Sequence, residues 1–373
     1  MSHKRLFRRF LEADKERLHF AAHSHHPWPD VTFEAHMQAW EDAARLMDDK
    51  WDTIFGRIIP EIRIRISTML NLPDPGSVVF APNTHEFVVR LFSCLDPPVR
   101  IVTTDAEFHS FDRQVRRWEE ARLAEVVRVE SEPFDTFADR IRSAVREAGM
   151  VYLSQVFFDS GFVVENLEAI VAEAPEDSLF VVDGYHAFMA LPTALDRLSG
   201  RVFYLGGAYK YAMAGEGACF MHCPPGFGER PVDTGWFAGF DHLTKRGAEV
   251  TYGDAGDRFW GATFDPSGLY RFLAVLRLME AEGITPAVIH RHVEGLQQRL
   301  LETGTVPGEL IPAAGVARGN FLTFRTDRAD ALYQGLHDQN VIVDRRGDRL
   351  RIGFGIYQDL DDVDRLARAL SAF

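Results

Sequence analysis

The chain has 373 residues, of which 46% are hydrophobic and 26% are charged, and its formal net charge is −14. This length and balance are typical of a globular protein with one large domain and a smaller one. The negative charge disfavours a nucleic-acid-binding surface, because such surfaces depend on clustered Lys and Arg side chains that contact phosphates.

The N-terminal stretch 1–18 is charged throughout and has no apolar core of a signal peptide. No later run approaches the ~18 apolar residues that are needed to span a bilayer. The three cysteines, Cys94, Cys219 and Cys223, form no C-x-x-C pair and do not supply a set of zinc ligands. We therefore expect a soluble, cytoplasmic protein that contacts no membrane and holds no metal.

Three histidines follow in the stretch LHFAAHSHHPWPD, at His23, His25 and His26. Their spacing on an extended segment does not form a closed tetrahedral site, and no carboxylate partner is obvious. The pattern disfavours a metal and leaves open whether the segment contacts a substrate or is a structural loop.

From about residue 76, short apolar runs alternate with amphipathic stretches. This alternation predicts βαβ units and a mostly parallel sheet that is covered on both faces. The expected strands are Val78–Ala81, Arg100–Thr104, Met150–Ser154, Leu179–Asp183, Val202–Gly206 and Ala218–His222. The expected helices between them are Glu86–Leu95, Asp112–Ala121, Phe134–Glu147 and Asn166–Ala174.

After about residue 280 the pattern changes to a long helix at Thr285–Thr303, the strands NFLTF, VIVD and LRIGF, and helices at Arg328–Gln339 and Leu360–Leu370. This pattern predicts a compact α+β domain with a small sheet. We expect an N-terminal helical segment (1–60) that packs on the small domain, a large α/β domain (61–280) and the small C-terminal domain (281–373).

The most informative residues are Asp183 and Lys210. An apolar strand ends in Asp183, His186 follows three residues later, and a second apolar strand leads to Tyr209 and Lys210 in a Gly-rich turn. Pyridoxal phosphate needs a neutral lysine amine for its imine and a carboxylate beside the pyridine nitrogen. The pattern therefore favours this cofactor, although an ordinary βαβ crossover with a surface lysine has the same residues.

Three weaker features lie at the ends of other predicted strands. A helix that opens at Thr84 offers an anion site for a phosphate, unless Thr84 only caps it. The stretch EFHS presents Phe108, a flat side chain for stacking on the pyridine ring or for an aromatic loop. Ser154 and Gln155 follow a strand and are placed to reach the 3′ oxygen of the cofactor.

Together the motifs EFHS, SQVFFDSG, VVDGYH and YKYAMAGEG resemble the class V aminotransferase family of fold-type I pyridoxal phosphate enzymes. Within it the order is most similar to kynureninases, from about Leu18 to the end of the chain. The resemblance implies a large domain with a mostly parallel, seven-stranded-type sheet, a small C-terminal domain, and a homodimer with shared active sites.

The resemblance also implies roles for the residues of the two central motifs. Lys210 matches the imine lysine, and Tyr209 matches a tyrosine that binds the phosphate. Asp183 matches the partner of the pyridine nitrogen, and His186 matches the residue that flanks the ring oxygen. Phe108 matches the stacking position.

The remaining matches lie farther apart in the chain. Asn83 and Thr84 match the phosphate-binding turn, and Trp236 matches a tryptophan beside phosphate and substrate. Thr263 falls where the family uses a residue from the neighbouring subunit. Arg351 matches the arginine that binds the substrate carboxylate, a role that also suits its bidentate fork. In relatives the segment of His25 runs past the mouth of the active site.

Three departures from the kynureninase pattern bear on the substrate. The motif GWF is followed by Ala238 rather than a Gly-His pair, the Asn expected near Thr263 is missing, and Phe111 replaces an Asp. These changes weaken the prediction of kynurenine as the substrate more than they weaken the prediction of the cofactor. We expect an enzyme that acts on a small amino acid through an external aldimine and a quinonoid.

The expected reaction is hydrolytic Cβ–Cγ cleavage that releases alanine, with Lys210 as the base. Three alternatives stay open: class V amino transfer to a 2-oxo acid, pyridoxal-phosphate-dependent C–S lysis, and a degenerate cofactor-binding scaffold. The neighbouring Arg345, Arg346 and Arg349 are alternative candidates for the carboxylate site.

Overall fold

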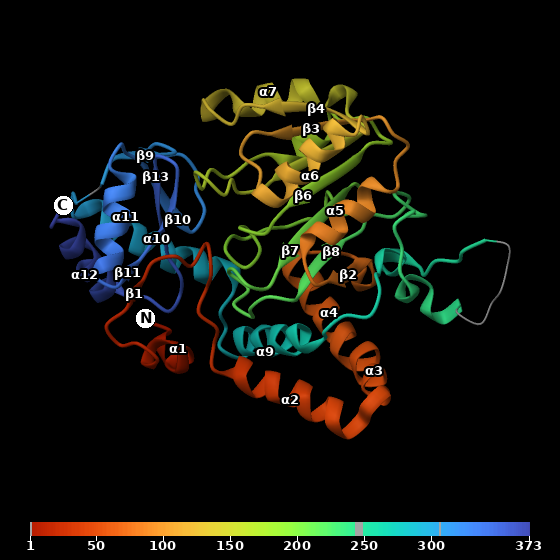
Figure 1. The fold of residues 1–373 in the computed structure, drawn as a ribbon, viewed down its shortest axis with the longest axis horizontal. Coiled ribbons are helices and arrows are strands. Elements are labelled where there is room, and N and C mark those ends of the chain that lie inside the picture. Colours follow the sequence, from red (N-terminus) through yellow and green to blue (C-terminus); the bar gives the residue numbers. More distant parts are fainter. Residues whose placement is uncertain (1, 243–248, 306) are drawn as a thin grey trace.

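The computed structural model describes residues 2–242, 249–305 and 307–373. Figure 1 shows a large sheet with helices packed around it, and beside it a smaller group of C-terminal elements in blue. Each part has its own cluster of buried apolar side chains.

The large sheet has the strand order β2-β8-β7-β6-β5-β3-β4. Only β8 runs antiparallel to its two neighbours, and the remaining pairs are parallel. The strands are β2 (Val78–Ala81), β3 (Val99–Thr104), β4 (Ala124–Val129), β5 (Met150–Ser154), β6 (Leu179–Asp183), β7 (Val202–Gly207) and β8 (Cys219–His222). This architecture confirms the predicted α/β class.

The central strands form where the sequence has unbroken apolar runs, because helices cover both faces of the sheet. Every residue of β5, β6 and β7 is buried. The sequence analysis missed β4, whose residues AEVVRV are mostly half-buried or exposed. It is an edge strand, so it lacks the continuous apolar run of an interior strand.

Most helices around the large sheet bury apolar side chains. They are α2 (Val31–Leu46), α3 (Lys50–Thr53), α4 (Ile59–Leu70), α5 (Thr84–Phe92), α6 (His109–Glu120), α7 (Phe137–Ala144), α8 (Leu167–Val171) and α9 (Ser267–Ala281). Helix α2 packs along α9 at the base of the view in Figure 1. Across the described residues, no helix combines the length and the apolar character that crossing a membrane requires.

The smaller part is built around a four-stranded antiparallel sheet with the order β12-β13-β10-β9. Its strands are β9 (Glu309–Ile311), β10 (Phe321–Arg325), β12 (Asp344–Arg346) and β13 (Arg349–Gly353). Its helices are α10 (Pro286–Glu302), α11 (Ala329–Asp338) and α12 (Leu360–Leu370). Helix α12 begins with a capping box between Asp359 and Asp362.

The N-terminal segment divides between the two cores. After the short helix α1 (Arg8–Glu12), strand β1 (Leu18–His19) pairs in parallel with β11 (Val341–Ile342). Leu18 and Phe20 belong to the smaller core, whereas Ile54 and Ile58 belong to the larger one. The domain boundaries near residues 60 and 280 stay predictions.

Gly184 tests the close packing behind the end of β6. A Cβ atom at this position would lie 2.0 Å from Cζ of the buried Tyr204 ring. Gly184→Ala should therefore lower the free energy of unfolding by about 1–3 kcal/mol through overpacking. Urea denaturation followed by circular dichroism measures the change.

The matched control is Gly200→Ala. A Cβ atom there would meet nothing within 4 Å, so the free energy of unfolding should stay within about 0.5 kcal/mol of wild type. Equal denaturation midpoints for the two variants would contradict the packing argument.

Candidate active site

Lys210 lies in the turn that follows β7 and is buried, with 5% of its surface exposed. Its Nζ atom is 2.9 Å from Nε2 of His186, and 4.9 and 5.2 Å from the ring centroids of Tyr185 and Phe108. Burial lowers the pKa of Lys210, Asp183 opposes this shift and the positive charge of Arg351 adds to it, so that the pKa is about 7. A large share of this amine is therefore neutral near pH 7, as a nucleophile requires.

Asp183 ends the neighbouring strand β6 and is also buried. Strands β6 and β7 are parallel partners, so their carboxyl ends meet at one edge of the sheet. The hydroxyl group of Tyr152 donates to Oδ2 of Asp183 at 2.6 Å, and the backbone N–H of Tyr185 donates to Oδ1 at 2.9 Å. These two donors fix the orientation of the carboxylate.

His186 connects the lysine to the N-terminal segment. Its Nε2 atom lies 2.9 Å from Lys210 Nζ and 3.2 Å from the backbone oxygen of His23. Burial, followed by the charge of Lys210, lowers the pKa of His186 well below its usual value. The imidazole is therefore neutral near pH 7, and its contact with the lysine is a hydrogen bond rather than a repulsion between two positive charges.

These side chains line one cavity of about 240 Å³. The structure thus brings together most of the predicted cofactor residues, which come from four different strand ends: Asn83, Thr84, Phe108, Asp183, His186, Tyr209 and Lys210. Ser154, Tyr185, Glu216 and Cys219 complete much of its wall. The convergence of an amine, a carboxylate and aromatic rings marks this cavity as the candidate active site.

The N-terminus of α5 opens into the same cavity. Asn83 rather than Thr84 caps the helix, since Oδ1 of Asn83 accepts from the backbone N–H of Glu86 at 3.1 Å. Thr84 is the first helical residue and lines the cavity. Unpaired N–H groups and the helix dipole make this end suitable for an anion such as a phosphate.

Three other predicted residues do not line this cavity. The side-chain nitrogen of Gln155 donates to Thr193 Oγ1 at 3.1 Å, and its side-chain oxygen accepts from the hydroxyl group of Tyr204 at 3.0 Å. Gln155 therefore turns away from the cavity, and its neighbour Ser154 lines the cavity instead. Trp236 is 43% exposed and donates through Nε1 to Oγ1 of Thr263 at 3.1 Å. These positions leave Trp236 and Thr263 outside the site of their own chain.

His25 and Arg351 do not line the cavity, but each contacts residues that do. His25 is exposed, its ring lies 5.5 Å from that of Tyr209, and its Nε2 atom is 3.5 Å from Glu216. Arg351 is buried and pairs with Asp344 and with the backbone oxygen of Phe158, a residue of the cavity wall. Arg351 therefore lies behind the wall rather than in it.

The sequence analysis gave no role to Glu107, which the structure buries between β3 and β5. Its carboxyl group is bonded to Thr104 Oγ1 at 2.8 Å, to Ser154 N at 3.1 Å and to Ser154 Oγ at 2.5 Å. Burial raises the pKa of Glu107 to about 8, against the effect of these hydrogen bonds and with the help of the charge on Asp183. The only feature of the sequence that could have pointed to Glu107 is its position directly before Phe108, the predicted stacking residue.

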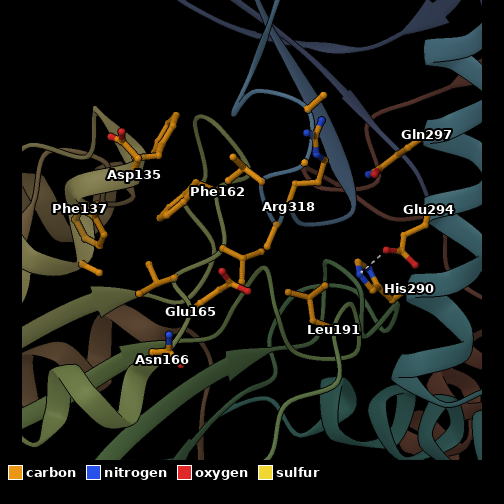
Figure 2. Close-up of a pocket in the computed structure, with 18 of the residues that line it drawn as sticks. Asp135, Phe137, Phe162, Glu165, Asn166, Leu191, His290, Glu294, Gln297 and Arg318 are labelled. Carbon is orange, nitrogen blue, oxygen red and sulfur yellow. Dashed lines mark ion pairs between the residues drawn. The ribbon is translucent and has the colours of Figure 1, made fainter.

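A second cavity of about 920 Å³ lies between the two parts of the chain. Figure 2 shows its wall, with Phe137, Phe162 and Glu165 on one side and His290 and Glu294 of α10 on the other. It contains neither the buried lysine nor its carboxylate partner. The chemistry therefore belongs to the smaller cavity.

Comparison with known proteins bears on the family of the chain. Residues 277–370 match a family model described as the kynureninase C-terminal domain. Isopenicillin N epimerase of Streptomyces clavuligerus is 25% identical over 331 residues, which cover 80% of each chain. These matches confirm the resemblance to the class V aminotransferase family that the motifs indicated.

Solved structures confirm the fold. A complex of the cystine C–S lyase C-DES with its product cysteine persulfide has a TM-score of 0.81 at 18% identity, over 96% of this chain and 98% of that one. The apo cysteine desulfurase of Thermococcus onnurineus NA1 has a TM-score of 0.83 at 18% identity, over 100% and 98%. The predicted fold-type I architecture is therefore confirmed.

Glu107 predicts a pH dependence of stability. Its pKa in the folded chain, about 8, is raised above the ordinary value of 4.5. The stability that Glu107 contributes is therefore complete below about pH 4.5 and is lost as the pH rises through about 8. Because Glu107→Gln cannot titrate, the unfolding free energy of wild type relative to this variant should fall between about pH 5 and pH 8.

Urea denaturation at a series of pH values measures this difference. Glu125→Gln, at an exposed position of β4, is the matched control and should follow wild type at every pH. Parallel curves for wild type and Glu107→Gln would show that the buried carboxyl group does not titrate as inferred.

Proposed function

We propose that this protein is a pyridoxal-phosphate-dependent enzyme that acts on an α-amino acid. One observation carries the proposal: a buried lysine amine with a depressed pKa shares a small cavity with a buried, doubly hydrogen-bonded carboxylate. The relatives add support, since one matching structure is described as having glycine covalently linked to its pyridoxal phosphate cofactor.

The residues of the cavity fit this cofactor. Lys210 would form the covalent bond to its aldehyde carbon, and Asp183 would pair with the ring nitrogen. Phe108 supplies a flat face, and the N-terminus of α5 at Thr84 suits the phosphate, with Tyr209 as a further donor. When bound, the cofactor supplies an electron sink that stabilises negative charge at the substrate Cα.

Lys210 would also move the substrate proton. Once released from the cofactor, its Nζ atom can accept a proton from Cα, because a pKa of about 7 leaves much of the amine neutral near pH 7. His186 holds that atom at 2.9 Å and stays neutral itself, so it orients the amine without repelling its charged form. The wall around Lys210 is largely closed to water, which favours this exchange.

Arg351 is the arginine best placed to bind the substrate carboxylate. Arg345 pairs with Asp330, Arg349 with Glu132 and Asp159, and Arg346 with Asp344. Arg351 also pairs with Asp344, but it donates in addition to the backbone oxygen of Phe158, a residue of the cavity wall. Arg351 lowers the pKa of Lys210, which places its charge close to the amine. Its Nε atom is buried without a hydrogen-bond partner in the described part of the chain, and a carboxylate would satisfy it.

For the reaction we propose kynureninase-like hydrolytic cleavage of a Cβ–Cγ bond with release of alanine. The match of residues 277–370 to the kynureninase C-terminal domain supports it. C–S lysis of a sulfur amino acid is the second candidate, supported by the similarity to the cystine lyase. A desulfurase that uses a cysteine nucleophile is disfavoured, because the cavity cysteine, Cys219, is buried and its pKa is raised to about 12.

We also propose a cytoplasmic homodimer. Trp236 and Thr263 are hydrogen-bonded to each other and lie outside the cavity of their own chain. The resemblance assigns both residues to cofactor binding, and a second subunit would reconcile this role with their position.

Lys210→Ala tests the cofactor assignment. Wild-type protein reconstituted with pyridoxal phosphate should gain a visible absorbance band, and borohydride should fix the cofactor to the peptide that contains Lys210. The variant should show neither the band nor the labelled peptide, as measured by absorbance and mass spectrometry. Lys50→Ala, which lies outside the cavity, is the control and should behave as wild type.

A substrate panel tests the reaction. The reconstituted enzyme should release alanine from L-kynurenine or 3-hydroxykynurenine, measured by chromatography. Release of pyruvate and ammonia from L-cystine would favour the lyase instead, and glutamate formed from 2-oxoglutarate would favour amino transfer. A protein that binds the cofactor at Lys210 yet turns over no amino acid would be a scaffold.

A further inference from the structure

We propose that Asp344 is a positioning residue that orients Arg351 for the carboxylate of the amino-acid substrate. The inference rests on the proposed function and deepens it, because it assigns the selectivity for α-carboxylates to a pair of residues rather than to one. It depends on the contacts of Asp344, on the balance of charge around it, and on the ring of His23 behind it.

Asp344 and Arg351 face each other across two strands of the small sheet. They are register partners in the antiparallel pair β12–β13, and Oδ2 of Asp344 accepts from Nη2 of Arg351. Nη1 of Arg351 donates to the backbone oxygen of Phe158, whose residue lines the cavity. Two anchors thus hold the guanidinium plane, while its buried Nε has no hydrogen-bond partner among the residues that the structure describes.

The charges around Asp344 leave one positive charge in excess. Oδ1 of Asp344 accepts from Nη1 of Arg346 at 2.8 Å and from the backbone N–H of Arg345 at 2.7 Å. One carboxylate is therefore shared by two guanidinium groups, those of Arg346 and Arg351. A single substrate carboxylate would neutralise this excess, whereas an amine without a carboxylate would not.

The adjacent ion pairs do not supply the missing negative charge. Arg349 pairs with Glu132 and Asp159. Arg325 pairs with Glu132 and also lies 3.7 and 3.8 Å from the exposed carboxylates of Glu309 and Asp348. Among the described residues, none of these four carboxylates forms an ion pair with Arg346 or Arg351. The excess therefore stays with the three residues around Asp344 in the part of the chain that the structure describes.

His23 closes the other side of Asp344. Its ring stacks on Phe321 at 4.7 Å, and its Nδ1 atom fills the space that a Cβ atom of Gly353 would occupy. Its Nε2 atom lies 3.6 Å from Oδ2 of Asp344. Burial, followed by the charge of Arg351, lowers the pKa of His23 to about 4, so the ring is neutral near pH 7. The ring therefore limits where the Asp344 side chain can lie, and because it is neutral it does not compete with Arg351 for the Asp344 carboxylate.

The test compares two ligands that differ only in the carboxylate. Holoenzyme is titrated with L-alanine and with ethylamine, and the change in visible absorbance gives a Kd for each. Asp344→Asn should raise the Kd for L-alanine at least roughly tenfold, because the loss of the ion pair that orients Arg351 outweighs the added positive charge, and it should leave the Kd for ethylamine within about twofold. General misfolding would weaken the binding of both ligands, so the ratio of the two Kd values is the decisive quantity.

Asp330→Asn is the matched control, because it removes the carboxylate partner of Arg345, the residue next to Asp344, at an exposed position. Its Kd ratio should equal that of wild type. Arg346→Gln is the second variant: its side chain is 40% exposed, so folding should survive, and loss of the excess charge should weaken L-alanine binding alone.

Each outcome bears on a different claim. Wild-type protein without a cofactor band would contradict the proposed function itself. A cofactor-bound wild type that binds both ligands equally would overturn the carboxylate site at Arg351 and with it the role of Asp344. An Asp344→Asn variant with an unchanged or tighter Kd for L-alanine would overturn the role of Asp344 alone. An unchanged ratio in Arg346→Gln would overturn the charge argument.

Discussion

The buried amine of Lys210 is the constraint on which the rest of the site depends. An ammonium group at this position would lose its hydration, so burial moves the pKa to about 7 and leaves much of the amine neutral. Asp183 opposes that shift from the end of the neighbouring parallel strand. The balance gives a group that can attack a carbonyl carbon and still carry a proton.

The other polar groups of the cavity are arranged so that they add little net charge. His186 is neutral because it is buried beside Lys210. Glu107 holds a proton more tightly than an ordinary carboxyl group and is bonded to Ser154 and Thr104. Asp183 is therefore the buried anion of the site and faces the buried, titrating amine of Lys210, whereas Glu216 at the cavity wall is exposed to solvent.

The two parts of the chain meet through the N-terminal segment. His23 fills the notch at Gly353, and Nε2 of His26 would lie 2.5 Å from a Cβ atom at Gly355. Glycine is required at both positions because imidazole rings occupy the space of a side chain. The backbone oxygen of His23 also accepts from His186, so one segment contacts Arg351's strand and the lysine cluster.

The sequence by itself determined the strands whose apolar runs are buried on both faces, and with them the placement of Asp183 and Lys210. Parallel neighbours bring such strand ends together, so their meeting was predictable. The sequence did not reveal β4, because this edge strand lacks the continuous apolar run of an interior strand. It also did not reveal that the side chain of Gln155 bonds to Thr193. Only the tertiary structure decided that Glu107 is buried against Ser154 and that Arg351 is held by Asp344, because each contact joins residues whose burial depends on segments distant in the chain.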